Sequence, residues 1–451
     1  MKRITQFLVS LLITILAGYS VATAQPTDRE RVESNISQRI AEGPLVGVSV
    51  GYIAPDGEIS YLTKGNLSSE KSQKVTPQSV FKIGSVTKVF TTLALARFID
   101  ERSITLETKA DSLLGPKLSL PAYEGQEITL RDLVTHTSGL PRLPGNLQML
   151  DPQNPYKEYS ESKLQQFLAD YKLTREPGSR FQYSNLGMAI VGHILEEQYD
   201  MSYDQIIKQI IARPLQMQRA GIHLPAVDSS AFTRGHKNGN PVPYWDFPAV
   251  EAMGGLKSTT IDLTTFIKAH LGSRNSLSTA ISMVQDPLFD IGKSNKRVDK
   301  VGMGWMLSTE QDSIWWHNGG TGGYSSFVGM NAETGAGVVV LSNTQSSIDD
   351  IGFHLLDQNH QLDQMLSAQK LEKYVGQYKL NAGISYNISR DKNQLYVQKS
   401  GQQKIAIYPE KDHVFSLKVV NAKIEFAVTQ EGVQKLVLHQ NGQQYSAQKV
   451  N

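Results

Sequence analysis

The chain of 451 residues contains no cysteine. It therefore has no disulfide framework, no thiolate nucleophile, no Cys-ligated zinc or iron–sulfur cluster, and no cysteine to carry a lipid. Any catalytic chemistry must use oxygen and nitrogen side chains. A charge excess is also lacking, because 45 Lys and Arg residues stand against 43 Asp and Glu residues. Nucleic-acid-binding proteins usually carry a clear basic excess or stripe, so this balance argues against a nucleic-acid partner.

Long hydrophobic runs are scarce as well. The run over residues 7–17 is shorter than the roughly 20 residues that cross a bilayer. Lys2 and Arg3 precede it, and the small-x-small triplet Ala22-Thr23-Ala24 follows. This pattern predicts a signal peptide over residues 1–24, cleaved near Ala24, and hence a secreted or periplasmic protein without a stable membrane anchor. Cleavage would leave 43 basic and 43 acidic residues.

The remaining chain has the composition of a soluble globular protein, with 40% hydrophobic and 20% charged residues. Its length favours two or three domains. Residues 25–360 place strand patterns at both ends with helices between them. We therefore predict an α+β domain, in which helices flank an antiparallel sheet closed by the two ends of the segment. The expected helices cover residues 29–41, 85–99, 187–197, 262–270 and 348–356, and the expected strands cover 46–54, 58–62, 304–307, 313–316, 325–330 and 338–341.

The pattern changes after a polar linker at residues 361–370. From residue 374 onward, about eight short alternating segments are separated by turn signals at intervals of 8–12 residues. We predict that residues 371–451 form a separate all-β barrel, which has a plausible size for a small domain.

Ser85 and Lys88 form the first candidate for catalytic chemistry. Residues i and i+3 share one face of a helix, so the hydroxyl and the amine can meet. A buried lysine held near its neutral form can take the serine proton. The Ser-x-x-Lys spacing also occurs at six other serines, but only Ser85 opens the most apolar helix of the chain. The alternative for Ser85 is a plain helix N-cap.

Two further motifs follow along the chain. In Tyr183-Ser184-Asn185 the phenol can shuttle a proton and the amide can orient a substrate carbonyl. The alternative for this triplet is a half-buried Tyr beside a turn Asn.

The segment 317–323, His-Asn-Gly-Gly-Thr-Gly-Gly, follows a predicted strand ending at Trp316, and its glycines let a ligand approach the backbone. It is not a phosphate loop, because no Lys-Ser/Thr pair ends it. Its alternative is a Gly-rich hairpin turn.

In this order and spacing, the motifs resemble those of the penicillin-recognising serine hydrolases: class C β-lactamases, D-alanyl-D-alanine carboxypeptidases, and related esterases and D-amino-acid peptidases. Tyr183-Ser184-Asn185 is similar to the Tyr-x-Asn form of the second motif, and His317-Asn318-Gly319 stands where Lys-Thr-Gly would stand. Segments 135–141, 177–178, 254–256, 262–263 and 302–305 match as well. The resemblance covers roughly residues 30–360. The C-terminal barrel resembles the lipocalin-like module of some of these hydrolases.

The resemblance implies a catalytic role for three residues and no cofactor or metal. Ser85 would be acylated, Lys88 would help to deprotonate it, and Tyr183 would pass the proton to the leaving group. A water would then hydrolyse the acyl-enzyme, with Tyr183 as base.

The resemblance also implies the substrate-binding residues. Asn185 would hold the substrate amide and Lys88, and His317 and Gly319 would line the site. The backbone N–H groups of Ser85 and Gly320 would form the oxyanion hole. His136, in one of the matching segments, is expected to fix its own loop, because buried polar groups usually bond locally.

His317 departs from the lysine of the family motif. A lysine is charged near neutrality and suits a β-lactam carboxylate, whereas a histidine with an ordinary pKa of about 6.5 is largely neutral. We therefore expect an exported serine hydrolase that cleaves small esters, amides or D-amino-acid peptides. A class C-type β-lactamase and a non-catalytic penicillin-binding module are the open alternatives. The expected partner is a small-molecule or peptide substrate, and a homo-oligomer formed through the C-terminal barrel is also open.

Overall fold

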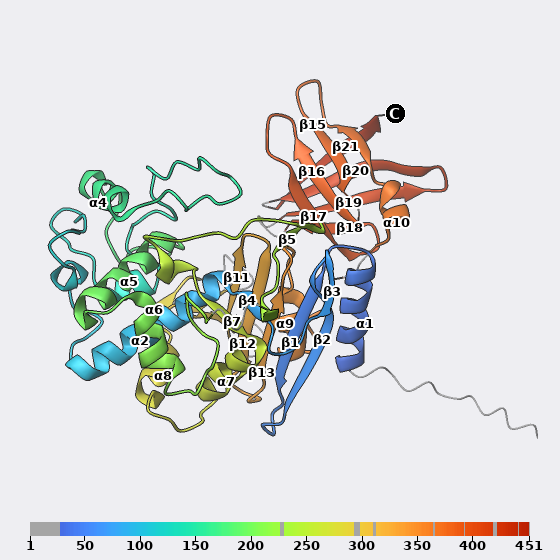
Figure 1. Ribbon diagram of the computed structural model, residues 1–451. Helices are drawn as coiled ribbons and strands as arrows, with labels where there is room; N and C mark the ends of the chain where they lie inside the picture. Colours follow the sequence, from blue (N-terminus) through green and yellow to red (C-terminus); the bar gives the residue numbers. More distant parts are fainter. Residues whose placement is uncertain are drawn as a thin grey trace, which may run out of the picture.

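The computed structural model describes residues 28–225, 230–292, 298–309, 313–363, 366–391, 393–417, 422–440 and 442–450. The predicted signal peptide lies outside the described residues. Figure 1 shows a central sheet with a large group of helices on one side, further helices on the other, and a β-barrel beside them. The predicted α+β architecture and the C-terminal barrel are confirmed.

The central sheet is antiparallel and has the strand order β3-β2-β1-β13-β12-β11-β10-β9-β8. β1 at the start of the domain pairs with β13 at its end, with Val50 opposite Val340, so the two ends of the segment close one sheet as predicted. The strands are β1 (Gly47–Ile53), β2 (Ile59–Ser68), β3 (Lys71–Lys74), β8 (Phe289–Asp290), β9 (Lys300–Val301), β10 (Met306–Ser308), β11 (Ile314–Thr321), β12 (Tyr324–Asn331) and β13 (Gly337–Ser342).

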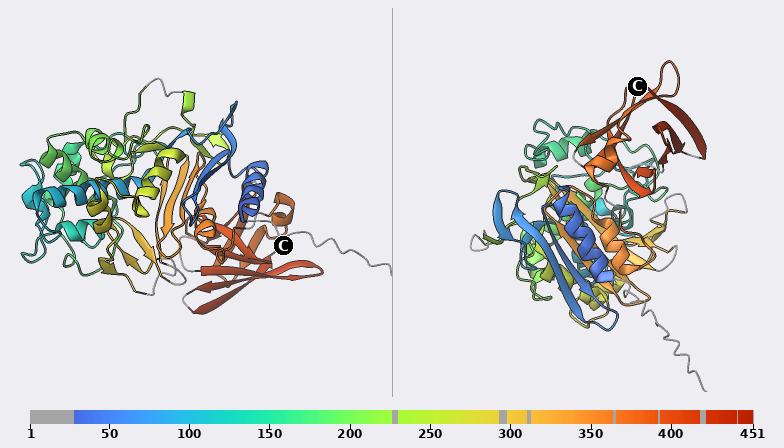
Figure 2. Two further views of the ribbon diagram at one scale, coloured as in Figure 1. Left: turned by 90° about the horizontal axis from the view of Figure 1, so that it is seen from below. Right: turned by 90° about the vertical axis from the view of Figure 1, so that its right-hand side faces the viewer.

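Helices cover both faces of the sheet (Figure 2). The larger group comprises α2 (Thr87–Arg102), α3 (Leu130–Val134), α4 (Glu161–Asp170), α5 (Asn185–Tyr199), α6 (Tyr203–Ile206), α7 (Thr260–His270) and α8 (Ser278–Val284). Short strand pairs join this group: β4 (Val80–Lys82) with β7 (Lys257–Thr259), and β5 (His236–Lys237) with β6 (Asn240–Pro241). α1 (Asp28–Ala41) and α9 (Asp349–Leu356) lie on the opposite face.

The central strands are apolar on both sides because both faces are covered. In β13, Val338 and Val340 pack with α1 and α9, whereas Val339 and Leu341 belong to the core beneath the larger helical group. This alternation follows from the period of two along a strand. A buried ion pair between Arg39 of α1 and Asp350 of α9 ties the two outer helices together.

The C-terminal barrel is closed and has its own core. Its strands are β14 (Gly376–Lys379), β15 (Ser385–Asp391), β16 (Gln394–Lys399), β17 (Ile405–Lys411), β18 (Val414–Leu417), β19 (Ala422–Thr429), β20 (Gly432–Gln440) and β21 (Gln443–Val450), preceded by the short helix α10 (Ala368–Glu372). Phe415 and Phe426 meet edge to face inside it, with ring centroids 5.5 Å apart. Among the contacts with the rest of the chain, Asn238 Nδ2 donates to Asp391 Oδ2 at 2.8 Å.

None of the helices in the part of the chain that the structure describes has the length and apolar character needed to cross a membrane.

Candidate active site

Ser85 and Lys88 lie at the junction between a 3₁₀ turn, Gly84–Val86, and helix α2. Lys88 Nζ donates a hydrogen bond to Ser85 Oγ at 3.1 Å and another to the carbonyl oxygen of Met253 at 2.5 Å. The helix that we expected to begin at Ser85 begins at Thr87, and its N-cap position is Val86. The N-cap interpretation of Ser85 is therefore wrong. Its hydroxyl stands on a partly exposed turn, in contact with the amine.

The Lys88 amine is fully buried in the base of the site. Burial, together with the nearby Arg142 guanidinium, holds the pKa of Lys88 well below that of an ordinary lysine. A lowered pKa favours the neutral amine. A neutral amine can keep one N–H on the Met253 carbonyl while its lone pair accepts a proton from Ser85.

The Tyr183 phenol is hydrogen-bonded to the Ser85 hydroxyl. Lys88 Nζ lies 5.1 Å from the centroid of the Tyr183 ring, and the guanidinium carbon of Arg142 lies 5.0 Å from the same centroid. Burial raises the pKa of Tyr183 to about 12, although the hydrogen bond to Ser85 and the charge of Arg142 oppose the rise. The phenol therefore keeps its proton near neutral pH.

Four hydrogen bonds tie the segment at residues 136–142 to the segment at residues 182–185. Two of them come from His136: its carbonyl accepts from the Gln182 amide at 2.7 Å, and its Nδ1 accepts from the Ser184 amide at 3.2 Å. The Ser184 hydroxyl donates to the Pro141 carbonyl at 2.8 Å, and the Asn185 amide donates to the Arg142 carbonyl at 3.0 Å. The expected loop-fixing role of His136 agrees with these contacts.

Asn185 is the first residue of α5, two positions earlier than the predicted helix start, and Ser184 is its N-cap. The Ser184 hydroxyl accepts from the Gly187 amide at 2.9 Å. Within the described ranges, Asn185 Oδ1 is buried without a hydrogen-bond partner. A buried acceptor without a partner is costly, and such a group is expected where a ligand supplies the missing donor.

The segment 317–321 is not a turn. Strand β11 runs on from Trp316 to Thr321, and Gly319 and Gly320 pair with Ser326 and Ser325 of β12. The predicted strand end at Trp316 is therefore wrong. The hairpin interpretation of segment 317–323 holds only for residues 322–323, where the chain turns from β11 into β12. The glycines suggested a loop, but the register with β12 keeps them extended.

The glycines of β11 let this strand lie directly against the Ser85 turn. A Cβ on Gly319 would stand 2.2 Å from the carbonyl oxygen of Ile83 and 3.0 Å from the Ser85 amide nitrogen. Gly84 has a φ of +51°, and a Cβ there would stand 2.9 Å from the Gly320 amide nitrogen. The Ser326 hydroxyl donates to the Ile83 carbonyl at 2.7 Å and helps to hold the turn against the strand.

His317 is buried beside Tyr183, with ring centroids 6.1 Å apart. Burial, followed by the proximity of Lys88, lowers the pKa of His317 to about 3, so the imidazole is neutral. Nδ1 lies 2.6 Å from the Asn318 carbonyl, which fixes the proton on Nδ1. Nε2 is then a buried acceptor, and it has no partner among the described residues. The neutral histidine predicted from the sequence agrees with this environment.

Several residues around the site were not identified from the sequence. The Met253 carbonyl holds Lys88, Arg142 lies over Tyr183, and Asp349 at the start of α9 accepts from Asn318 Nδ2 at 2.7 Å. Met253 and Arg142 stand directly beside matching segments, which is the signal that could have pointed to them. Asp349 is brought in only by the fold.

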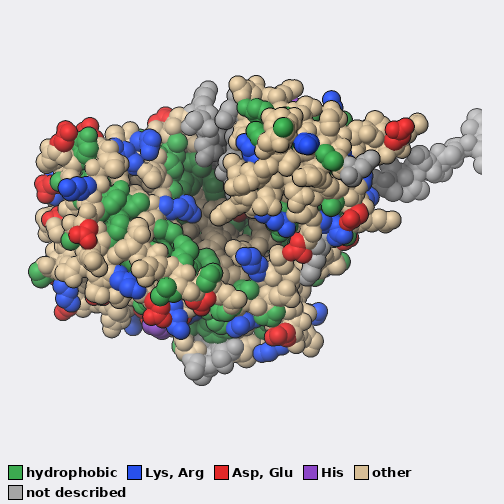
Figure 3. All heavy atoms as spheres, turned by 90° about the horizontal axis from the view of Figure 1, so that it is seen from above, with side chains coloured by type: hydrophobic (Ala, Val, Ile, Leu, Met, Phe, Trp, Pro, Cys, Tyr) green, Lys and Arg blue, Asp and Glu red, His purple; other side chains and the backbone are tan. Residues whose placement is uncertain are grey.

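The surface is hollowed between the larger helical group and the barrel, and Lys and Arg side chains gather around the hollow (Figure 3). Aromatic residues form one wall close to Ser85. Phe247 would contact a Cβ placed on Gly254, which itself lies against Gly84. The Tyr156 ring stacks on Phe247 with centroids 5.1 Å apart.

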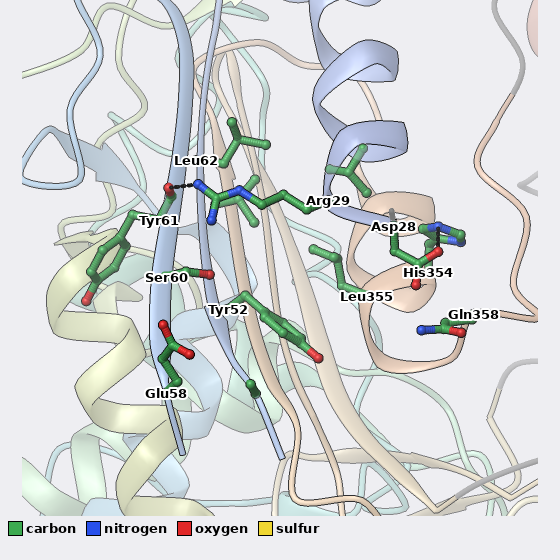
Figure 4. A pocket seen from close by; sticks show the side chains of 13 residues that line it. Asp28, Arg29, Tyr52, Glu58, Ser60, Tyr61, Leu62, His354, Leu355 and Gln358 are labelled. Carbon is green, nitrogen blue, oxygen red and sulfur yellow. Dashed lines mark hydrogen bonds and ion pairs between the residues drawn. The ribbon is translucent and has the colours of Figure 1, made fainter. Parts of the chain in front are cut away.

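A separate pocket lies between α1, β1, β2 and α9 (Figure 4). It is lined by Arg29, Tyr52 and Glu58 among others, and the Arg29 guanidinium donates to the Tyr61 carbonyl at 3.4 Å. None of the motif residues lines it. No group of three or more His, Asp or Glu side chains that could hold a metal occurs in the described segments.

The chain is similar to known proteins over most of its length. A family model described as beta-lactamase matches residues 32–362, and a model described as a domain of unknown function, DUF3471, matches residues 363–449. Penicillin-binding protein 4* of Bacillus subtilis is 24% identical, over 87% of this chain and 93% of the relative. The D-alanyl-D-alanine-carboxypeptidase/endopeptidase AmpH of Escherichia coli K12 is 26% identical, over 76% of this chain and 91% of the relative.

Among solved structures, the octameric penicillin-binding protein homologue from Pyrococcus abyssi superposes with a TM-score of 0.68 at 23% identity. The superposition covers 94% of this chain and 100% of the other, so the likeness of fold extends beyond the hydrolase region. The lipocalin likeness of the barrel stays a prediction.

Proposed function

The chain belongs to the beta-lactamase family of serine hydrolases, and from that premise we propose that it cleaves small esters, amides or D-amino-acid peptides through an acyl-enzyme on Ser85. The observation that carries the proposal is the contact between the Ser85 hydroxyl and the Lys88 amine at 3.1 Å, with the amine buried and its pKa lowered.

Acylation begins with the neutral Lys88 amine, which takes the proton of Ser85 as its oxygen attacks the substrate carbonyl. The Met253 carbonyl orients the amine by accepting one of its N–H groups. The backbone N–H groups of Ser85 and Gly320 stabilise the oxyanion that develops, and each such donor is worth about 10²–10³ in rate. The close packing of Gly84 against Gly320 supports this pairing of the two amides.

Tyr183 transfers the proton to the leaving group. Because its pKa is raised to about 12, the phenol is protonated and can donate while it receives a proton from the Ser85–Lys88 pair. The same relay runs in reverse during deacylation. A water attacks the ester, and the pair formed by Tyr183 and Lys88 accepts the proton of that water.

Asn185 and His317 each offer the substrate amide a hydrogen-bond acceptor. Asn185 Oδ1 and His317 Nε2 are both buried acceptors that lack partners among the described residues, so a substrate N–H can satisfy either of them. A neutral His317 gives no charge to a β-lactam carboxylate. This difference favours peptide, amide and ester substrates over a dedicated β-lactamase.

A turnover panel tests the proposal. The purified protein is assayed with p-nitrophenyl esters, D-amino-acid amides, N-acyl-D-alanyl-D-alanine and nitrocefin, alongside Ser85→Ala. We expect ester or D-peptide turnover that Ser85→Ala abolishes. Turnover of nitrocefin alone would indicate a β-lactamase. Stoichiometric labelling of Ser85 by a fluorescent penicillin, without release of product from any substrate, would indicate a binding module.

We also propose that the protein is exported by its N-terminal segment and assembles into a homo-oligomer through the barrel. The signal-peptide pattern at residues 1–24 supports export. The match to a homologue described as octameric supports assembly. N-terminal sequencing of protein from a periplasmic extract should begin near Gln25, and light scattering should give a mass above that of one chain. An uncleaved N-terminus or a monomeric mass would contradict these statements.

A further inference from the structure

The pocket of Figure 4 lies over β1, between the two helices on the outer face of the sheet. α1 packs on β2, and α9 packs on β12 and β13. Because side chains alternate along a strand, Val50 and Tyr52 of β1 and Ser60 and Leu62 of β2 point into the pocket. Its volume is about 380 Å³, which lies in the range of sites for small molecules.

One end of the pocket holds two hydrogen-bond acceptors that face each other. His354 is fully buried, and its Nδ1 lies 2.6 Å from the His360 carbonyl, which keeps the proton on Nδ1. In the neutral ring Nε2 is then an acceptor, and it has no hydrogen-bond partner among the described residues. Asp28 Oδ1 lies 3.7 Å from Nε2, which is too far for a hydrogen bond. An ammonium group between the two atoms would donate to both and would match the charge of Asp28.

The other end of the pocket carries a cation. Figure 4 shows the Arg29 guanidinium beside β2, across the pocket from Asp28 and His354. The guanidinium donates to the Tyr61 carbonyl at 3.4 Å, and within the described ranges no carboxylate forms an ion pair with it. A guanidinium carries five N–H donors in one plane, so Arg29 keeps donors for a carboxylate of a ligand.

The middle of the pocket is mainly apolar. Leu62 and Leu355 line it, together with the ring of Tyr52. Burial, followed by the charges of Asp28 and Asp56, raises the pKa of Tyr52, so its hydroxyl keeps its proton. A matching ligand therefore has an ammonium group at one end, a carboxylate at the other, and an apolar part between them.

We propose that this pocket binds a short peptide of two or three residues with free termini and apolar side chains. The ammonium group of the peptide lies between Asp28 and His354, and its carboxylate meets Arg29. The pocket lies on the face of the sheet opposite α2 and shares no residue with the catalytic site. The inference goes beyond the proposed function, because it assigns a second ligand site that does not depend on acylation of Ser85.

The test measures binding by calorimetry on the Ser85→Ala protein, in which the proposed route of cleavage is blocked. The probes are leucyl-leucine in its L,L and D,D forms, the N-acetyl derivative of each, and the C-terminal amide of each. We expect at least one of the two forms to bind. N-acetylation and amidation should each weaken the affinity about 3–30-fold, because each removes one charge-assisted contact.

Variants assign each terminus of the peptide to its end of the pocket. Asp28→Asn should weaken binding of the free dipeptide about 3–30-fold and change the affinity for the N-acetyl derivative less than twofold. Arg29→Gln should weaken binding of the free dipeptide in the same way and change the affinity for the amide less than twofold. Glu33→Gln and Lys64→Gln are the matched controls, because this ion pair joins α1 to β2 outside the pocket.

The pattern of loss decides the outcome. A loss that disappears when the matching terminus is blocked supports the proposal. Binding that Asp28→Asn and Arg29→Gln both leave unchanged would place the peptide in the catalytic site and overturn it. A larger loss in Glu58→Gln than in Asp28→Asn would overturn the position of the ammonium group, because the Glu58 side chain is exposed at the edge of the pocket.

Failure of either dipeptide form to bind at millimolar concentration would also overturn the proposal. Ester and D-peptide turnover by the wild-type protein is measured separately. A protein that hydrolyses these substrates but binds no dipeptide in this pocket would therefore contradict the inference alone, and a protein that binds the dipeptide here but hydrolyses nothing would contradict the proposed function alone.

Discussion

At the scale of single residues, the site depends on one buried amine. Lys88 is held by the Met253 carbonyl and meets Ser85 at 3.1 Å, in surroundings that lower its pKa. A lysine with an ordinary pKa would be protonated at neutral pH and could not accept the serine proton. The catalytic property of this residue therefore comes from its burial as much as from its position.

The rate of acylation should follow the ionisation of Lys88. Because the neutral amine is the active form, kcat/KM for a neutral p-nitrophenyl ester should rise with pH and level off well below the ordinary lysine pKa. It should stay level until the pH approaches the Tyr183 pKa of about 12, where the phenol loses its proton. Lys88→Ala should lower the plateau about 10²–10⁴-fold and abolish the rise. A rise centred near pH 10.4, the value of a free lysine, would contradict a lowered pKa.

Gly319 should be intolerant of any side chain. A Cβ there would lie 2.2 Å from the Ile83 carbonyl oxygen and 2.4 Å from Ser326 Oγ, so Gly319→Ala must push β11 away from the Ser85 turn. We expect a loss of about 1–3 kcal/mol of stability and a marked fall in kcat/KM. Gly320→Ala is the stability control, because no atom lies within 4 Å of its Cβ position. Thermal unfolding that is equal for the two variants would contradict this packing.

At the scale of elements, the Tyr-x-Asn segment is positioned by helix α5 and by the loop at residues 136–142. Ser184 serves both, because its hydroxyl accepts from the Gly187 amide and donates to the Pro141 carbonyl. Ser184→Ala should cost about 0.5–2 kcal/mol and lower kcat/KM by up to about 10²-fold through misplacement of Tyr183. Denaturant unfolding and ester hydrolysis measure the two effects.

Ser160→Ala is the matched control for that experiment. Ser160 is the N-cap of α4, and its hydroxyl accepts from the Lys163 amide at 3.4 Å on the surface. The Ser160→Ala protein should lose a comparable amount of stability, because it loses a helix cap, while its kcat/KM stays at the wild-type value. An equal loss of activity in both variants would show that Ser184 acts through general stability alone.

Sequence patterns predicted the long, periodic elements well. The helices around residues 29–41 and 262–270 and the eight barrel segments agree with α1, α7 and β14–β21 within a few residues. The errors lie where long-range pairing overrides local preference. Gly319 and Gly320 look like a turn, yet β12 holds them in a strand. That the three motifs meet in one site could be expected from the sequence. The hydrogen bond between Lys88 and the Met253 carbonyl could not, because the two residues lie 165 positions apart and only the fold brings them together.

At the scale of the whole molecule, the barrel has a core of its own. Its buried apolar residues form a cluster separate from those of the hydrolase region. The described contacts between the two parts include polar ones, such as that of Asn238 with Asp391 and that of Asn393 with Glu42. Two cores joined in this way should unfold in two distinguishable transitions.

Phe415 and Phe90 test this separation. Phe415 is fully buried in the barrel, and Phe90 is fully buried in α2, where it stacks on Phe266 at 4.1 Å. Each replacement by alanine should cost about 3–5 kcal/mol in its own transition. Calorimetry should therefore show that each variant lowers the midpoint temperature of a different unfolding transition. Ser85 should stay reactive in the Phe415→Ala protein. A single transition lowered by both variants would contradict two independent cores.

The central claim is that Ser85 carries the acyl group, and mass spectrometry after a rapid quench tests it most directly. The protein is mixed with an excess of a p-nitrophenyl ester, quenched within the first turnover, digested and mapped. The account predicts one acyl group on the peptide that contains Ser85, in step with the burst of p-nitrophenol, and none in Ser85→Ala. An acyl group on another residue, or release of p-nitrophenol without any adduct, would contradict it.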